Sequence, residues 1–216
     1  MITKIIQENE IEKAIQYVKQ GKIIIYPTES CYALGVNALD EQAIMKIRNI
    51  KGRYDKAITV IVSDLNVMKK YGYIGKRASM LADTFMPGPL TLVVDKKEII
   101  PDILDPNEIA FRISSHPVAH ELVKKFGGII TTTSANISGN PPIYKISEIL
   151  SVFNNRVDLI INGGNLEKNP VSTILSLRAN IPYIKREGVI NNDILFSFLK
   201  KNKIYVYNDY KLENKW

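Results

Sequence analysis

The sequence predicts one α/β domain built around a mixed β-sheet. Short apolar runs rich in β-branched residues alternate with segments whose apolar residues recur at helical spacing, as expected for alternating strands and helices. Two pairs of apolar runs in the second half follow each other without a helix between them, which favours some antiparallel pairing. With 216 residues, the chain is long enough to bury one large core.

The first quarter of the chain is predicted to form a helix, a strand and a second helix. Apolar residues at helical spacing predict the first helix over 8–20. The run 23–26 (IIIY) is too short for a helix and predicts a buried strand, which Pro27 ends because proline has no amide hydrogen for a sheet ladder. Asp40 is placed to cap the second helix, which should reach about Ile50.

The later elements follow from the same two patterns. Proline is favourable at the first helical position, so one helix should begin at Pro117 and reach about Phe126. The other predicted helices span 75–85, 146–153 and 191–201. The predicted strands span 57–62, 90–94, 109–113, 128–133, 157–161, 171–177 and 181–185.

Composition and charge limit the function classes. Lys and Arg total 29 against 22 Asp and Glu, a net charge of +7 that suits phosphate-bearing partners, although a lysine-rich solvated surface gives the same figure. No apolar run approaches the roughly 20 residues of a membrane span, and the N-terminus lacks the apolar centre of a signal peptide. A single cysteine suits a reducing compartment, so a cytoplasmic location without membrane attachment is expected.

Several catalytic motifs are absent from the sequence. It has no GxGxxG, and the segment 72–77 has neither the spacing nor the Ser or Thr of a phosphate-binding P-loop. His116 and His120 are four residues apart, but Pro117 should leave His116 outside the helix, and no third metal ligand is evident. Cys31 lies among apolar residues and is interpreted as a core residue. An enzyme of this kind would position its substrates rather than attack them.

Three polar stretches carry the candidate chemistry. Lys51 and Arg53 follow the second helix with Gly52 between them, and alone they are typical of a solvated helix end. The loop 131–139 is rich in small polar residues, which are ordinary in turns. The stretch 26–35 begins at a strand end, where α/β sheets present ligand-binding groups. Together they indicate a site for an anionic substrate.

In order and spacing, these stretches resemble the YrdC/Sua5 family of L-threonylcarbamoyladenylate synthases over roughly residues 8–190. The matching segments are YPTES at 26–30, LG at 34–35, NAL at 37–39, KGR at 51–53, PGP at 87–89, AFR at 110–112, TSANISG at 133–139, VSTI at 171–174 and KREG at 185–188. The resemblance implies a single YrdC-like domain, with a twisted mixed sheet flanked by helices and a positively charged concave surface.

The resemblance also implies an activity. Members are nucleotidyltransferases that join L-threonine, bicarbonate and ATP, with Mg²⁺ accompanying the ATP, into threonylcarbamoyl-AMP and pyrophosphate. A threonylcarbamoyl transferase then uses that product to form N6-threonylcarbamoyladenosine at position 37 of tRNA. The alternative is a non-catalytic, RNA-binding relative, and a third possibility is another carbamoyl-adenylate former of the kind found inside larger maturation proteins.

The resemblance assigns roles to nine residues. The residues implied for ATP are Lys51, Arg53, Ser134, Asn136 and Arg186, of which Lys51 and Arg53 would be catalytic through the phosphates. The residues implied for threonine are Ser30, Arg112, Thr132 and Ser172, and no protein-held metal is implied. Structural alternatives remain open: a surface ion pair for Arg112, ordinary strand side chains for Thr132 and Ser172, and a turn-forming role for Ser30.

The chain departs from the family pattern in the predicted threonine pocket and at its C-terminus. Ala33 replaces a common glycine, Tyr54 replaces a common proline, Glu187 stands in a segment that is usually RPG, and no histidine occurs near Val62. Residues 1–200 are predicted to form the domain. Residues 201–216 form a basic, aromatic tail, a composition that suits RNA, an extra strand or a docking segment.

Overall fold

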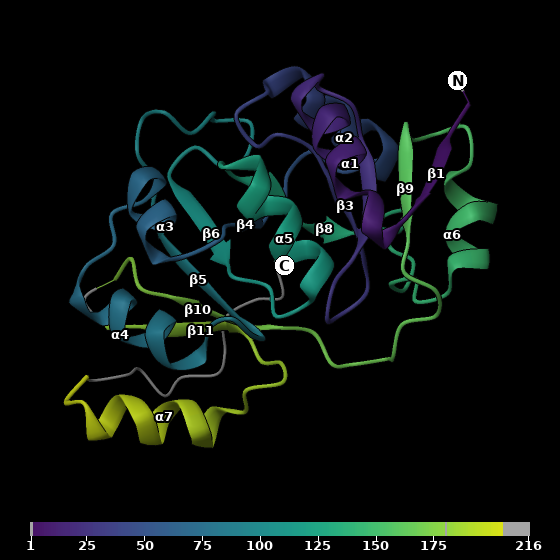
Figure 1. Ribbon diagram of the computed structural model, residues 1–216. Coiled ribbons are helices and arrows are strands. Elements are labelled where there is room, and N and C mark those ends of the chain that lie inside the picture. Colours follow the sequence, from purple (N-terminus) through teal and green to yellow (C-terminus); the bar gives the residue numbers. More distant parts are fainter. Residues whose placement is uncertain (1, 180, 205–216) are drawn as a thin grey trace.

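The strands form two sheets in the computed structural model, which describes residues 2–179 and 181–204 (Figure 1). The first sheet has the order β1-β9-β2-β3-β8, with strands Lys4–Gln7 (β1), Leu159–Asn162 (β9), Ile24–Pro27 (β2), Tyr32–Gly35 (β3) and Thr133–Ser134 (β8). The second has the order β11-β10-β5-β6-β4-β7, with strands Tyr183–Arg186 (β11), Thr173–Ser176 (β10), Leu90–Asp95 (β5), Glu108–Arg112 (β6), Val60–Ile61 (β4) and Ile130–Thr131 (β7).

Both sheets are mixed, and helices flank them. In the first sheet β1 and β9 are parallel while β2 and β3 are antiparallel; in the second β10 and β5 are parallel while β5 and β6 are antiparallel. The helices are α1 (Ile11–Lys19), α2 (Glu41–Lys51), α3 (Leu65–Tyr71), α4 (Lys76–Phe85), α5 (Pro117–Phe126), α6 (Ile146–Phe153) and α7 (Asn192–Lys201), with a 3-10 turn at Glu8–Glu10. The predicted α/β class with mixed pairing is confirmed, although the strands divide between two sheets.

The division between the sheets occurs inside a segment that the sequence predicted as one strand, 128–133. The amide of Thr131 donates to Val36 O (3.0 Å), whereas the amide of Thr132 donates to Thr59 O (2.7 Å). Val36 directly follows β3 and Thr59 directly precedes β4, so these two amides meet different sheets as the chain passes from β7 in one sheet to β8 in the other. This crossing brings polar side chains of both sheets together.

Three elements of the structure, β1, β3 and α3, were not predicted from the sequence. Strand β1 is a sheet edge with a single buried residue, so it carries no apolar run. Strand β3 completes a hairpin with β2, and its residues were interpreted only as part of a ligand-binding turn. Helix α3 is short, but Asp64 caps it by accepting hydrogen bonds from the amides of Asn66 (2.7 Å) and Val67 (3.0 Å), a signal that the sequence did contain.

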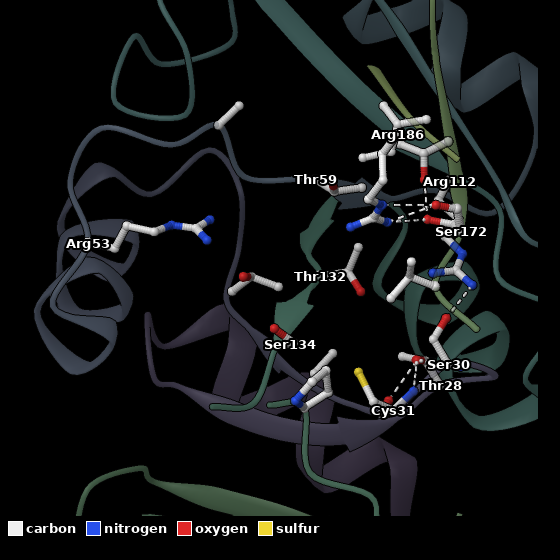
Figure 2. A pocket seen from close by; sticks show the side chains of 17 residues that line it. Thr28, Ser30, Cys31, Arg53, Thr59, Arg112, Thr132, Ser134, Ser172 and Arg186 are labelled. Carbon is white, nitrogen blue, oxygen red and sulfur yellow. Dashed lines mark hydrogen bonds between the residues drawn. The ribbon is translucent and has the colours of Figure 1, made fainter. Parts of the chain in front are cut away.

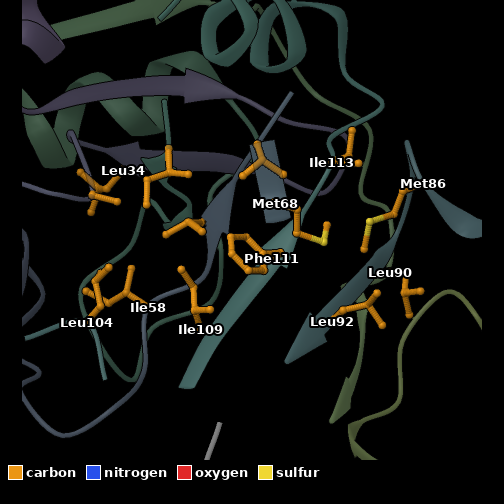
Figure 3. Packing of buried hydrophobic residues seen from close by; sticks show 14 of the residues in the cluster. Leu34, Ile58, Met68, Met86, Leu90, Leu92, Leu104, Ile109, Phe111 and Ile113 are labelled. Carbon is orange, nitrogen blue, oxygen red and sulfur yellow. The ribbon is translucent and has the colours of Figure 1, made fainter. Parts of the chain in front are cut away.

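Two apolar cores hold the sheets and helices together. In β2, Ile25 faces the larger core with Leu34 and Phe111 (Figure 3), while Ile24 and Tyr26 face a smaller one under α1 and α5. Side chains of a strand alternate between faces, so a strand buried on both faces needs an uninterrupted apolar run. This explains the sequence of 23–26 and fixes the position of the turn that follows it.

The helix ends next to the candidate site follow the predicted signals. Asp40 caps α2 by accepting a hydrogen bond from the amide of Ala43 (2.9 Å), and Gly52 ends it at φ +63°. Pro117 is the first residue of α5, directly after His116. No helix among residues 2–179 and 181–204 is long and apolar enough to cross a membrane. The last residues of the predicted tail, 205–216, lie outside the described residues.

Candidate active site

A cavity lined from both sheets contains seven of the nine predicted site residues (Figure 2). Its volume is about 200 Å³. The predicted residues in its wall are Ser30, Arg53, Arg112, Thr132, Ser134, Ser172 and Arg186. The rest of the wall is mostly small or hydroxyl-bearing, and none of the lining residues is acidic. Three arginines therefore make this lining cationic.

Strand register explains why residues far apart in sequence meet here. Thr91 lies near the start of β5, and Arg112 ends the antiparallel neighbour β6. Ile174 pairs with Thr91 on one side and with Arg186 on the other. The turn 28–31 follows β2 in the other sheet and lies next to Arg112 (Figure 2). Strand ends of one sheet and a turn of the other thus meet on the same side of the cavity.

The turn 28–31 is rigid and presents Ser30 to Arg112. Thr28 Oγ1 donates to Cys31 O (2.7 Å) and accepts from the amide of Ser30 (3.2 Å). Nη2 of Arg112 then donates to Ser30 Oγ (2.8 Å) and lies 2.7 Å from Oε1 of Glu29. Nε of Arg112 is buried without a hydrogen-bond partner. The guanidinium group as a whole lines the cavity and gives it a positive charge that can attract a carboxylate.

Glu29 is a site residue that the sequence analysis quoted but did not assign. Its carboxylate pairs with Arg112 and also accepts a hydrogen bond from Ser114 Oγ (2.5 Å). Both side chains of the ion pair are shielded, with 9% of Arg112 and 17% of Glu29 exposed. Glu29 therefore holds Arg112 in place from behind the cavity wall. A glutamate directly before a predicted ligand-binding serine was the available signal.

Arg186 and Thr91 fix the position of Ser172. The Nη2 atom of Arg186 donates to Ser172 O (2.8 Å) and Ser172 Oγ (3.1 Å), and Oγ of Ser172 lies 3.0 Å from Thr91 Oγ1. Burial and the nearby charge of Arg112 lower the pKa of Arg186. Arg186 is thus already hydrogen-bonded to Ser172, the residue directly before β10. Thr91 was not predicted, because a threonine inside an apolar run gives no sign of its direction.

Lys51 and Asn136 lie behind the cavity wall rather than in its lining. Nζ of Lys51 donates to Ser134 O (2.6 Å), Asn136 O (3.1 Å) and Asn136 Oδ1 (2.9 Å), so it ties the end of α2 to the loop 134–136. Ser134 Oγ also donates to Asn136 Oδ1 (2.6 Å). Burial, with the adjacent charge of Arg53, lowers the pKa of Lys51 to about 8. Four of the five predicted ATP residues, at positions 51, 53, 134 and 136, thus lie near one another, whereas Arg186 lies next to Ser172.

Arg53 differs from the other cations of the site. Within the described part of the chain, its guanidinium forms no hydrogen bond or ion pair, and it lies on the side of the cavity away from Arg112 and Arg186 (Figure 2). Partial burial, with the charge of Arg48, lowers its pKa, yet the group stays protonated at neutral pH. Its five donors are free to meet an anion such as a phosphate.

Chemistry other than anion binding has little support in this lining. Cys31 is buried in the cavity wall, and burial raises the pKa of its thiol to about 11, so it is protonated and a poor nucleophile at neutral pH. Among the described residues, no three His, Cys, Asp or Glu side chains are grouped to hold a metal ion.

Comparison with known proteins places this architecture in one family. A family model named Sua5/YciO/YrdC, described as "Telomere recombination", matches residues 16–188. A putative threonylcarbamoyl-AMP synthase of Methanocaldococcus jannaschii is 38% identical over 86% of this chain and 90% of its own length. The threonylcarbamoyl-AMP synthase of Pyrococcus abyssi is 35% identical over 85% of this chain, which spans only 55% of that relative.

Solved structures agree with these sequence matches. The crystal structure of P. abyssi Sua5 complexed with L-threonine superposes with a TM-score of 0.84 at 31% identity, over 95% of this chain and 62% of that one. Escherichia coli YciO superposes with a TM-score of 0.80 at 28% identity, over 87% of this chain and 97% of that one. Matched over most of its length in both sequence and structure, the chain belongs to the Sua5/YciO/YrdC family.

Proposed function

We propose that this protein is an L-threonylcarbamoyladenylate synthase, a nucleotidyltransferase that uses L-threonine, bicarbonate and ATP. The observation that carries the proposal is one cavity with arginines on two separate sides: Arg53, whose guanidinium has no partner among the described residues, on one side, and Arg112 with Ser30 on the other. Relatives named threonylcarbamoyl-AMP synthase, and a neighbour solved with L-threonine, support the same reading.

The amino acid would occupy the wall formed by Arg112. Its carboxylate would pair with the guanidinium of Arg112, and Ser30, Thr132 and Ser172 would surround the rest of it with hydroxyl groups. A volume of about 200 Å³ lies below the roughly 300–1,000 Å³ of ordinary ligand pockets, so the enclosed part suits an amino acid better than a whole nucleotide. The nucleotide would extend from this part towards Arg53.

The ATP phosphates would occupy the wall formed by Arg53 and Ser134. Arg53 offers a planar fork for phosphate oxygens, and Lys51 holds the loop that carries Ser134 and Asn136. Arg186 would add positive charge close to both substrates. Mg²⁺ would enter with the phosphates and neutralise part of their charge, because the described side chains do not form a metal site of their own.

The reaction needs no protein nucleophile. The deprotonated amine of threonine attacks the carbon of bicarbonate, forming a C–N bond and, after loss of water, a carbamate. A carbamate oxygen then attacks the α-phosphorus of ATP, and the bond to the β-phosphate oxygen breaks to release pyrophosphate. Holding the reactants in line can supply roughly 7–11 kcal/mol of the barrier. Arginines aimed at the phosphates stabilise the charge that develops there.

The product would be consumed by a transferase that moves the threonylcarbamoyl group to adenosine 37 of tRNA. That partner, direct tRNA contact and a cytoplasmic location are part of the proposal. The RNA-binding alternative rests on the net charge and on a tail most of which lies outside the described residues. The cavity gives it no support, because non-catalytic RNA binding does not need an enclosed pocket with a buried, unpartnered guanidinium nitrogen.

Labelled bicarbonate provides a direct test of the activity. The purified full chain is incubated with ATP, Mg²⁺, L-threonine and [¹⁴C]bicarbonate, and the label is followed into an adenylate while pyrophosphate is measured. We expect both signals only when threonine and bicarbonate are present together. Pyrophosphate release that does not depend on either one, or no labelled adenylate at all, would refute the proposal.

Arg112→Lys is expected to weaken threonine binding selectively. Lysine keeps the charge near Glu29 but has no planar fork, so the carboxylate loses a charge-assisted hydrogen bond worth about 1.5–3 kcal/mol. The KM for threonine should rise by about tenfold or more. The KM for ATP should change by less than about twofold, since Arg53 lies on the other wall. Steady-state pyrophosphate release checks both values, and equal changes in the two would contradict the assignment.

A further inference from the structure

Arg48 is a buried arginine in α2 that forms no ion pair with a carboxylate among residues 2–179 and 181–204. It is 6% exposed, and burial lowers the pKa of its guanidinium, while the nearby charges of Asp55 and Asp105 partly offset that shift. A desolvated cation without an ion-pair partner costs free energy unless its donors are well satisfied. In the sequence, Arg48 lies one helical turn before Lys51, and this position does not indicate that its side chain is buried.

The donors of Arg48 are satisfied by backbone carbonyls from two separate loops. Nη1 donates to Tyr54 O (2.8 Å), Lys56 O (3.1 Å) and Arg53 O (3.5 Å). On the other side, Nε donates to Ile103 O (3.1 Å) and Nη2 to the same oxygen (2.5 Å). The guanidinium therefore links the segment 53–56 to the loop at residue 103.

The segment 53–56 needs such a link because no regular structure holds it. Gly52 ends α2, and no strand begins until β4 at Val60. Carbonyl groups in an irregular segment lack the partners that a helix or sheet would supply. Yet this segment carries Arg53 and leads to Ala57, both of which line the cavity. The position of Arg53 thus depends on what holds its own backbone.

We propose that Arg48 is a positioning residue that sets the place of Arg53 in the cavity by gripping the backbone of residues 53–56. The inference rests on the proposed function, since it takes ATP as the ligand of Arg53. Arg48 does not line the cavity, so its effect on ATP passes through Arg53. Only a planar group with donors on two sides spans both loops, and lysine therefore does not replace arginine here.

A double-mutant cycle separates positioning from a general structural role. ATP affinity is measured by titration calorimetry on the full chain for the wild type, Arg48→Lys, Arg53→Ala and the double variant. We expect Arg48→Lys to weaken ATP binding about tenfold in the wild type and less than about twofold in the Arg53→Ala background. Threonine affinity should stay within about twofold in all four proteins. Arg156→Lys, at an exposed arginine outside the cavity, is the matched control.

Each other outcome is decisive. Equal factors in the two backgrounds, or unchanged ATP affinity in a folded Arg48→Lys protein, would overturn the inference while leaving the proposed function intact. No ATP binding by the wild type would remove the proposed function, and the inference with it. Circular dichroism reports folding, and Arg48→Gln, with two amide donors, replaces Arg48→Lys in the cycle if that variant is unfolded. Failure of both variants to fold would assign Arg48 a purely structural role and overturn the inference.

Discussion

Replacing Arg53 by alanine should lower the rate of pyrophosphate release by at least about a hundredfold, the range seen when one preorganised donor is removed from a site of developing charge. Arg53 is the cation of the cavity wall whose guanidinium has no hydrogen bond or ion pair with another described residue. It can therefore meet a phosphate without first breaking a protein contact. The same arrangement predicts a rise in the KM for ATP, because ground-state phosphates are bound by the same fork.

The fold should survive this substitution, since the Arg53 guanidinium forms no hydrogen bond or ion pair with another described residue. Thermal unfolding followed by circular dichroism should show a midpoint within a few degrees of the wild type. Arg156→Ala, at an exposed arginine outside the cavity, serves as the control and should keep full activity. Wild-type turnover in a folded Arg53→Ala protein would remove the phosphate role from this residue.

Lys51→Met should also lower turnover by about a hundredfold, but through the loop 134–136 as well as through charge. The ammonium of Lys51 makes three hydrogen bonds to that loop, and methionine fills a similar volume without any donor. Ser134, which lines the cavity, would lose one of the two hydrogen bonds to its carbonyl and keep the one from the Asn136 amide. We therefore expect both a higher KM for ATP and faster amide hydrogen exchange across 134–136. Reduced turnover with unchanged exchange would mean that Lys51 acts through its charge alone.

The same lysine predicts a pH dependence of stability. Its pKa is about 8 in the folded chain and about 10.4 when exposed, so above pH 8 the unfolded chain holds more protons. The free energy of unfolding that Lys51 contributes should then rise with pH, by up to about 1.4 kcal/mol per unit between pH 8 and 9.5. Urea unfolding of wild type and Lys51→Met at several pH values isolates this term. A constant difference between the two proteins would show that the pKa of Lys51 is not lowered.

Apolar runs, helix caps and prolines correctly predicted the elements that are specified by their own residues. The apolar run at 23–26, the cap at Asp40 and the proline at 117 each specify an element through its own residues, and the structure confirms all three. Strand β1 lacked such a signal, because an edge strand with one buried residue carries no apolar run. Strand β3 did have one, the apolar run 31–36, but these residues were interpreted as part of a ligand-binding turn. The segment 128–133 was predicted as one strand because apolarity does not report which sheet each amide will join.

The candidate site followed the same division between local and long-range information. The sequence by itself determined which polar stretches belong together and the family to which the chain belongs. Only the tertiary structure decided that Lys51 grips a loop 83 positions away, that Glu29 supports Arg112, and that Arg48 holds the backbone around Arg53. The reason is physical: a side chain's role depends on which donors and acceptors the fold brings within about 3 Å of it. Those partners come from distant segments, and their meeting is fixed by sheet register and packing rather than by any neighbour in the chain.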